Sequence, residues 1–376
     1  MGTITRGLAN SITTGGKVVS TSLSGTIQAS NVNNESLDSV TAFDSSLGDF
    51  VESTASDVSA GPTTKGQLFY NTTDGVLKGI RLGADSFSSG GSLSAGRTTL
   101  GGAGTLTAGL AYGGTPTPGP SSVSTEEYNG TSWSGGGNLP VGREGVGGTG
   151  TQTAAFAVAG SDGTSPASLT SSDKYDGSSW TSSGTVGTAM SFHTAFGTQT
   201  AGFVAGGRGN NPFPKLTNTY TYDGSSFSSS TALPAGTDFL SSAGTSTAGI
   251  VFLGRSPSET SNSFEWNGSS WTAGGSLGTA RYSAGGLGIQ TAALAIGGIK
   301  NPNSYQSATE KYDGTSWTTS GATLATARGG GAASTQGTTT SAFYAGGANA
   351  PSSSPYQTAT EEFEAATEAV KTITTA

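Results

Sequence analysis

Four arginines recur at a regular distance along the chain and could together bind an anion. Arg97 and Arg143 are 46 residues apart, and Arg281 and Arg328 are 47 residues apart. A guanidinium presents several N–H donors in one plane, so it binds carboxylate and phosphate groups through paired hydrogen bonds. The spacing predicts a cationic arc for carboxylate or phosphate groups of a surface glycan. The alternative is a structural role, in which each guanidinium donates to backbone carbonyls of a neighbouring repeat.

A second group of candidates lies in connecting segments that differ in length and composition. Aromatic rings beside polar groups suit stacking on sugars or contact with a protein. For each of these residues the alternative is an ordinary exposed loop position. The candidates are Arg208, Phe213, Lys215, Arg255, Lys300, Tyr305 and Tyr356.

Residue types that most catalytic sites need are scarce. The chain has no cysteine, which excludes disulfides, zinc–thiolate sites and thiol nucleophiles, and it has one histidine. That histidine, His193, alternates with Phe192, and we expect a hydrogen-bonded interior residue rather than a ligand. The acidic pairs Glu126-Glu127 and Glu361-Glu362 fall on predicted outer strands, a poor place for the paired carboxylates of a glycosidase. We therefore expect no catalytic residues, no metal and no cofactor.

The composition of the 376 residues indicates a loop-rich β protein. Gly contributes 62 residues and Pro 13, only 32% of the chain is hydrophobic and 11% is charged, yet 31 residues are aromatic. The net charge of −8 argues against general nucleic-acid binding. No apolar run approaches the length of a membrane span, and the start MGTITRGLAN lacks the apolar core of a signal peptide. We therefore expect synthesis in a cytoplasm and no membrane insertion.

A short cassette of aromatic and turn residues repeats through the chain. It reads YNGTSW at 128–133, YDGSSW at 175–180, YDGSSF at 222–227, WNGSSW at 266–271 and YDGTSW at 312–317. A small-apolar run that ends in Gly precedes each cassette, as in FAVAG and LAIGG. Each unit thus predicts four strands: strand a after the Arg position, strand b in the apolar run, strand c before the cassette, and strand d after it. The Asn-Gly or Asp-Gly pair between c and d predicts a two-residue hairpin turn.

Four antiparallel strands in each of these units predict the blades of a β-propeller. The position of the four arginines occurs six times, with Met190 and Thr237 in the other two repeats. The apolar run also occurs six times, whereas the cassette occurs five times. The sixth strand c ends at Phe363, and no strand d follows it. Residues 84–94, with Phe87, resemble a strand d, so we expect them to complete the last blade and close a six-bladed ring. Closing a ring in this way hides the free strand edges.

The two faces of such a ring differ in how much they vary. The c–d turns and the a–b turns are nearly the same in every repeat, and in an up-and-down blade both lie on one face, here called the uniform face. The b–c connections lie on the other, variable face and differ strongly, from RGNNPFPKLTN to RSPSETSN. Because variable loops on a rigid scaffold commonly carry specificity, we expect binding on the variable face. The chain would join residues 1–83 at the uniform face.

The repeat resembles the kelch family, whose blades carry a double Gly after strand b and a spaced Tyr and Trp. The resemblance covers residues 84–364 and implies the propeller fold. One kelch type is a copper oxidase that uses Tyr, His and a Cys-modified Tyr. Without cysteine and with one histidine, this chain does not carry that activity over.

Residues 1–83 show no such repeat and predict a small β-rich anchoring domain; residues 365–376 are expected to be a C-terminal tail. GQLFYNTTDGVLK, within 61–82, predicts a hairpin across Thr73, Asp74 and Gly75, and a short helix is possible near Leu37–Leu47. The hairpin segment, the opening MGTITRGLANSITTGG and the kelch-like repeats together resemble structural proteins of marine tailed phages.

That resemblance implies a virion protein, which binds without catalysing a reaction. The first hypothesis is a tail fibre or receptor-binding protein that is attached to other virion proteins through residues 1–83 and forms a homo-oligomer, with a trimer favoured. Its partner would be a host-surface glycan or protein. The alternatives are a capsid-bound head fibre or decoration protein and a glycan-cleaving propeller enzyme.

Overall fold

The structure is a computed structural model of the chain. It describes residues 52–54, 57, 68–71, 73, 76–164, 168–350 and 356–372, and the secondary structure within these ranges is entirely β. The predicted helix near Leu37–Leu47 lies outside the described residues. The chain divides into two compact units, Met1–Ala84 with Ala366–Ala376, and Asp85–Ala365.

The smaller unit contains a four-stranded sheet with the order β1-β2-β3-β32. Its strands are β1 (Glu52–Thr54), β2 (Leu68–Asn71), β3 (Val76–Leu82) and β32 (Glu368–Thr372). The predicted hairpin is present, because β2 pairs antiparallel with β3 and Asn71 lies opposite Val76. The C-terminal segment contributes β32, which pairs antiparallel with β3. The two ends of the chain therefore share one sheet.

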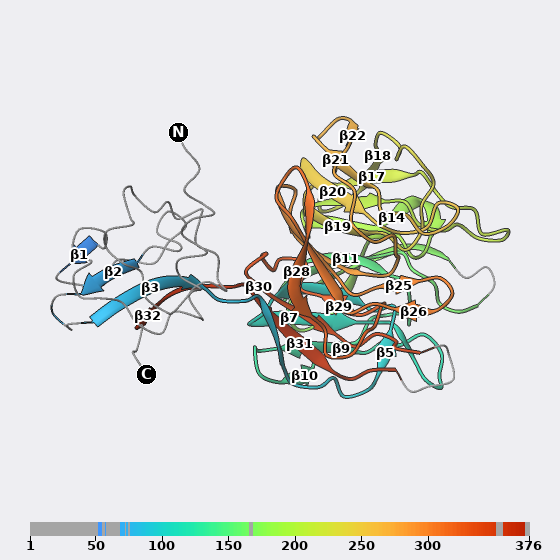
Figure 1. Cartoon of the computed structure of the whole chain (residues 1–376). Coiled ribbons are helices and arrows are strands. Elements are labelled where there is room, and N and C mark those ends of the chain that lie inside the picture. The colour runs from blue at the N-terminus through green and yellow to red at the C-terminus, as the bar shows by residue number, and fades with distance from the viewer. Residues whose placement is uncertain are drawn as a thin grey trace. The chain divides into compact units, whose positions relative to one another are not determined.

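The larger unit is the predicted six-bladed propeller, with four antiparallel strands in each blade (Figure 1). Blades one and two are β6 (Gly101–Thr105), β7 (Ala108–Tyr112), β9 (Thr125–Tyr128), β10 (Trp133–Gly135), and β11 (Gly147–Thr151), β12 (Ala154–Val158), β13 (Leu169–Tyr175), β14 (Trp180–Met190). Blades three and four are β15 (Thr194–Thr198), β16 (Ala201–Ala205), β17 (Thr219–Tyr222), β18 (Phe227–Ser229), and β19 (Ser241–Thr245), β20 (Ala248–Phe252), β21 (Ser263–Trp266), β22 (Trp271–Ala273). Blades five and six are β23 (Gly285–Ile289), β24 (Ala292–Ile296), β27 (Ala308–Tyr312), β28 (Trp317–Thr323), and β29 (Ala332–Ala333), β30 (Ser341–Ala345), β31 (Thr360–Glu364), β4 (Ser86–Ser89).

The sixth blade is closed by the start of the propeller, as the repeat count predicts. Strand β4 pairs antiparallel with β31, and Phe87 lies opposite Phe363. Their ring centroids are 5.3 Å apart in an edge-to-face arrangement. The outer edge of β31 is thus covered by a strand that comes from the other end of the propeller sequence.

A closed ring of six backbone hydrogen bonds joins the blades where their innermost strands begin. Each residue of the ring donates its N–H to the carbonyl of its counterpart in the preceding blade, over 2.6 to 3.1 Å. All six have φ between 55° and 72°, a left-handed conformation that turns each amide toward its neighbour. The ring residues are Thr99, Gly145, Phe192, Phe239, Ser283 and Gly330.

The turns between strands c and d are longer than predicted. Tyr128 pairs directly with Trp133, so the connection has four residues and not two. The side chain of Asn129 accepts hydrogen bonds from the N–H groups of Thr131 and Ser132, and only Gly130 has a positive φ, of 90°. Asn-Gly is therefore needed because the first residue caps the turn through its side chain and the second adopts the left-handed conformation.

Each of these turns packs against the a–b turn of its own blade, which places both on the uniform face. A Cβ built on Gly177 would lie 3.2 Å from Thr153, and one built on Gly130 would lie 3.4 Å from Thr107. The b–c connections leave the opposite ends of the strands and form the variable face.

The cassette aromatics connect neighbouring blades and have a structural role. Tyr175 of blade two donates to the carboxylate of Glu127 in blade one over 2.6 Å, and Trp180 donates to Thr125 over 2.9 Å. The glutamines of the a–b turns add a second connection, since Gln199 of blade three donates to the carbonyls of Ala155 and Tyr175 in blade two. The tyrosine contact recurs at Tyr128 and Tyr312, which donate to Glu362 and Glu265 of the preceding blades. The glutamine contact recurs at Gln152 and Gln290.

Candidate functional site

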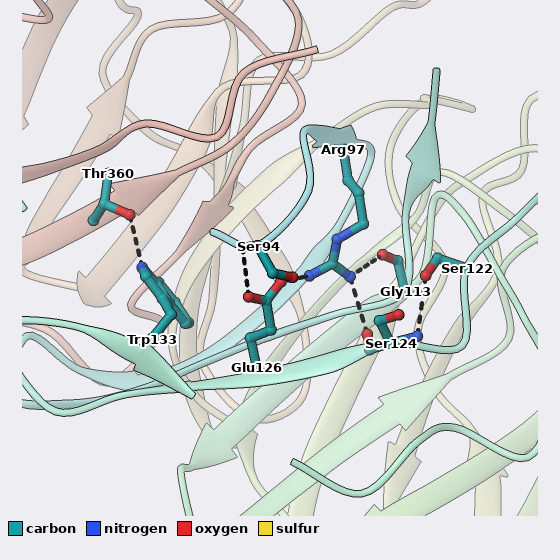
Figure 2. A network of polar contacts seen from close by, with 8 residues as sticks. All are labelled: Ser94, Arg97, Gly113, Ser122, Ser124, Glu126, Trp133 and Thr360. Atoms are coloured by element: carbon teal, nitrogen blue, oxygen red, sulfur yellow. Dashed lines mark hydrogen bonds and ion pairs between the residues drawn. The ribbon is translucent and has the colours of Figure 1, made fainter. Parts of the chain in front are cut away.

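The four regularly spaced arginines are buried at the start of their blades. Figure 2 shows Arg97, which donates to the carbonyls of Gly113 and Ser124 and to the carboxylate of Glu126, at 2.7, 3.0 and 2.6 Å. Glu126 also accepts a hydrogen bond from the backbone N–H of Ser94. Burial lowers the pKa of Arg97, and the charge of Glu126 opposes this shift.

The other three arginines make equivalent contacts. Arg143 pairs with Asp173 over 2.7 Å, Arg281 pairs with Glu310, and Arg328 pairs with Glu361. Each also donates to carbonyls of its own blade, such as Arg281 to Gly297. All four residues are at most 2% exposed. This geometry favours the structural alternative for the arginines, with the carbonyls supplied by the same blade and not by a neighbouring one.

The two remaining blades replace the ion pair with apolar or neutral residues. Met190, the last residue of β14, and Tyr220 take these positions for blade three, and Thr237 and Phe264 take them for blade four. Met190 and Tyr220 are buried in the same hydrophobic cluster. The position two residues before the cassette aromatic is thus acidic in the four blades that have the arginine. This pairing of an arginine with an acidic residue is visible in the amino-acid sequence and is the signal that indicates the ion pairs.

His193 lies in the interior, as predicted. The residue is 5% exposed, and the backbone of Val158 is the polar group that acts on its ring. The ring fills the place of the Cβ that Gly147 of the neighbouring blade lacks. Burial lowers the pKa of His193 to about 3, so the ring is neutral at physiological pH.

The acidic pairs on the c strands are used in contacts within and between blades. Glu126 and Glu361 hold arginines, whereas Glu127 and Glu362 accept hydrogen bonds from Tyr175 and Tyr128 of the following blade. Within the described ranges, no group of three or more His, Cys, Asp or Glu side chains is placed to hold a metal ion. The described residues also include no helix that is long and apolar enough to cross a membrane.

Four of the predicted loop residues gather on the variable face, around the rings of Phe192, Phe239 and Tyr282, which were not predicted to bind a ligand. We call this set the variable-face cluster: Phe192, Arg208, Phe213, Lys215, Asp238, Phe239, Arg255 and Tyr282. Phe192 and Phe239 stack with centroids 4.3 Å apart, and Tyr282 lies edge-on to Phe239 at 5.6 Å. The two phenylalanines belong to the backbone ring, which is why they face each other at the start of adjacent blades.

The cations of the variable-face cluster lie over these rings. The guanidinium carbon of Arg208 is 4.6 Å from the centroid of Phe192 and 5.5 Å from that of Phe213. Arg255 lies over Phe239 and Tyr282 at 4.4 and 4.8 Å. Such cation–π contacts are favourable because the ring faces carry negative charge density.

A single buried carboxylate serves the cations of the variable-face cluster. Asp238 accepts two hydrogen bonds from Arg255, both at 3.2 Å, and Lys215 lies 3.8 Å away. Lys215 also donates to the carbonyl of Pro257. Lys215 and Arg255 thus share this carboxylate, and Arg208 feels the charges of Asp238 and of Glu144 without an ion pair to either. With three cations and one carboxylate, the cluster is positively charged on a chain whose net charge is −8.

The three other predicted loop residues lie on blades five and six. Lys300 is exposed on the two-residue strand β25 (Ile299–Lys300), and Tyr305 is half-buried on β26 (Ser304–Tyr305). Tyr305 donates its hydroxyl to the carbonyl of Ala350 over 2.9 Å. Tyr356 is half-buried. None of these three belongs to the variable-face cluster.

A cavity of about 130 Å³ lies on the axis of the ring, lined by the first residues of the innermost strands. Phe192 and Phe239 line it together with His193 and Thr335. Toward the uniform face, Gln336 extends from blade six, and its backbone N–H donates to Gly104 of blade one. Its side chain donates to Thr149 of blade two and Gly197 of blade three. Gln336 therefore crosses the channel on that side of the cavity.

Comparison with known proteins supports the fold. The solved structure of YjhT is similar to this chain, with a TM-score of 0.60 and 14% sequence identity over 74% of this chain and 99% of YjhT. At this identity the likeness shows the propeller fold alone. No protein-family model matches the chain, and the search of curated proteins gave no significant match.

Proposed function

We propose that this chain is a virion-attached binding protein of a tailed phage, a tail fibre or receptor-binding protein whose propeller holds a host-surface ligand on its variable face. The observation that carries this proposal is the variable-face cluster. It gathers Arg208, Phe213, Lys215 and Arg255 from two different connections, with three cations beside one carboxylate.

The chain termini of the propeller are consistent with this arrangement. Strand β4 begins and β31 ends at the uniform-face end of blade six, where Ser86 lies opposite Glu364. A propeller that is joined to an anchoring unit at this end leaves its variable-face loops unobstructed by the connection. Attachment to other virion proteins through residues 1–83 and a trimeric state remain predictions from the resemblance.

The test is competition for adsorption. Purified full-length protein is added to host cells before the virions, and we expect the number of adsorbed virions to fall at least tenfold. Phe213→Ser should weaken this competition, because Phe213 is 53% exposed on the variable face. The matched control is Ile289→Ser, since Ile289 is 55% exposed at an a–b turn on the uniform face.

Three outcomes would contradict parts of the proposal. No competition at saturating protein would exclude receptor binding, and equal effects of the two substitutions would exclude the variable face as the binding surface. Immunogold labelling of virions with an antibody against the chain would show the position, and labels spread over the capsid would favour a head fibre or decoration protein instead.

A further inference from the structure

Arg208 and Arg255 occupy the same position in adjacent blades. In blades two to six, the residue before the backbone ring residue forms an isolated β-bridge with the start of the b–c connection. In blade one the equivalent residues, Thr98 and Thr115, pair in a short two-stranded ladder. In blade three this bridge joins Ser191 to Arg208, and in blade four it joins Asp238 to Arg255. The backbone is therefore equivalent in the two blades, and the side chains can be compared directly.

The comparison shows a carboxylate that is missing in blade three. Asp238 neutralises Arg255 through two hydrogen bonds at 3.2 Å. Ser191 stands in the place of that aspartate, and its hydroxyl contacts the hydroxyl of Ser168 over 3.0 Å. Across the residues that the structure describes, no oxygen accepts a hydrogen bond from the guanidinium of Arg208, and its buried Nε is without a partner.

The carboxylates of Asp238 and Glu144 act on the charge of Arg208 without a hydrogen bond to it, so the guanidinium lacks a direct anionic acceptor that a ligand can supply. The guanidinium lies among Phe192, Phe213 and Phe239, at 4.6, 5.5 and 5.6 Å from the ring centroids. Aromatic rings exclude water from part of the group, and a hydrogen bond to an anion is stronger in such a place than in bulk water. Lys215, by contrast, already has acceptors in Pro257 and Asp238.

We propose that Arg208 binds the anionic group, carboxylate or sulfate, of a sugar whose ring lies against Phe213. Phe213 is 53% exposed and adjoins the guanidinium, so it offers an apolar face beside the charge. Sugar rings bind such faces through their C–H groups while their substituents make polar contacts. This inference rests on the proposed function and names the chemistry of the ligand at the same surface.

The experiment measures binding of glucuronate and of glucose to the full-length chain by ligand-observed NMR. We expect glucuronate to bind at least tenfold more tightly than glucose, since the two differ in the carboxylate. Glucose 6-sulfate tests whether a sulfate can replace the carboxylate. Tight binding would assign the site to anionic sugars in general, and weak binding would restrict it to sugar carboxylates.

Ser191→Asp provides the sharpest variant, because it installs in blade three the carboxylate that blade four already has. It should weaken glucuronate binding at least tenfold by neutralising Arg208, while Ser191→Asn should bind as the wild type does. If Ser191→Asp fails to fold, Arg208→Gln tests the same point by removing the cation. Lys300→Gln, an exposed cation outside the variable-face cluster, is the control and should have no effect.

The results separate this inference from the proposed function. Equal affinity for glucuronate and glucose, no binding of either charged sugar, or unchanged binding by both Ser191→Asp and Arg208→Gln would overturn the inference. If the chain nevertheless competes for virion adsorption, the proposed function stands with a different ligand. If neither binding nor competition is found, both fail.

Discussion

His193 is a buried neutral base in a chain that has no other histidine. It packs against Gly147 of the neighbouring blade, and its pKa is lowered to about 3 because burial penalises the imidazolium form. The ordinary value of histidine applies to the unfolded chain, which therefore binds a proton at a higher pH than the native state does. Protonation thus favours unfolding.

This difference predicts a pH dependence of stability. The free energy of unfolding should be highest above pH 6.5 and fall between pH 6.5 and about 3, by ~1.4 kcal/mol per unit from this group alone. Urea unfolding at pH 7.5 and pH 5 measures it, with His193→Gln as the variant that lacks the titration. If the wild type and the variant lose the same stability between these two pH values, His193 does not titrate as proposed.

Within a blade, the arginine and acidic residue link the start of strand a to strand c. This element could be predicted only in part from the sequence. The recurrence of arginine every 46 or 47 residues is visible, but the same spacing suits both an exposed arc and a buried pair. Whether such an arginine is exposed or buried depends on its position within the blade. Arg97, at the start of strand a, is 2% exposed, whereas Arg208, in a b–c connection, is half-buried.

Blade three provides the natural replacement for this pair. Arg97→Met should destabilise the protein by ~3 kcal/mol, because it leaves the carboxylate of Glu126 buried without its partner. Combining it with Glu126→Tyr, to match Met190 and Tyr220, should recover most of the loss, since an apolar pair of similar volume avoids the desolvation cost. Denaturant unfolding of both variants checks this. A double variant no more stable than Arg97→Met would contradict it.

The turns show where local sequence patterns lead to an error. Asn129-Gly130 is a common two-residue hairpin signal, yet the cassette uses it in a four-residue connection. The following Thr131 and Ser132 donate their N–H groups to the Asn129 side chain, and this capping competes with the tighter turn. The cassette spacing identified the hairpin and its face, whereas the turn type depended on a side-chain contact.

At the scale of the whole molecule, the short strand β4 completes the sixth blade and so closes the ring. Gly90 and Leu93 extend the contact beyond β4, donating to the carbonyls of Thr360 and Thr358. A fragment 85–365 contains every strand of the compact propeller unit. A fragment 95–365 lacks β4 and leaves the edge of β31 unpaired.

We therefore expect the two fragments to differ sharply. Fragment 85–365 should unfold cooperatively, whereas fragment 95–365 should unfold at least ~10 °C lower or aggregate through its open edge. Circular dichroism melting with size-exclusion chromatography measures both. A synthetic peptide of residues 84–95 should raise the melting temperature of the shorter fragment. Identical melting temperatures would show that closure by β4 does not stabilise the propeller.

The global fold followed from the sequence better than the site did. The number of repeats predicts six blades, because each unit has to bury its strands against the next. It also predicts that both ends of the propeller sequence contribute strands to the last blade. The variable-face cluster depends instead on where the backbone ring places Phe192 and Phe239. Their partners lie 16 residues further along each blade, at Arg208 and Arg255, in loops that share little sequence.

The ring of six backbone hydrogen bonds also restricts how such a chain can evolve. Tandem repeats readily gain or lose copies by recombination, and in an open array the remaining units keep their contacts. In this ring, every amide N–H donates to a carbonyl of the preceding blade. The ring closes where Thr99 of blade one donates to Gly330 of blade six. A change in copy number would alter the angle at every junction at once, so such a chain diversifies by substitution and by loop length while the number of blades stays fixed.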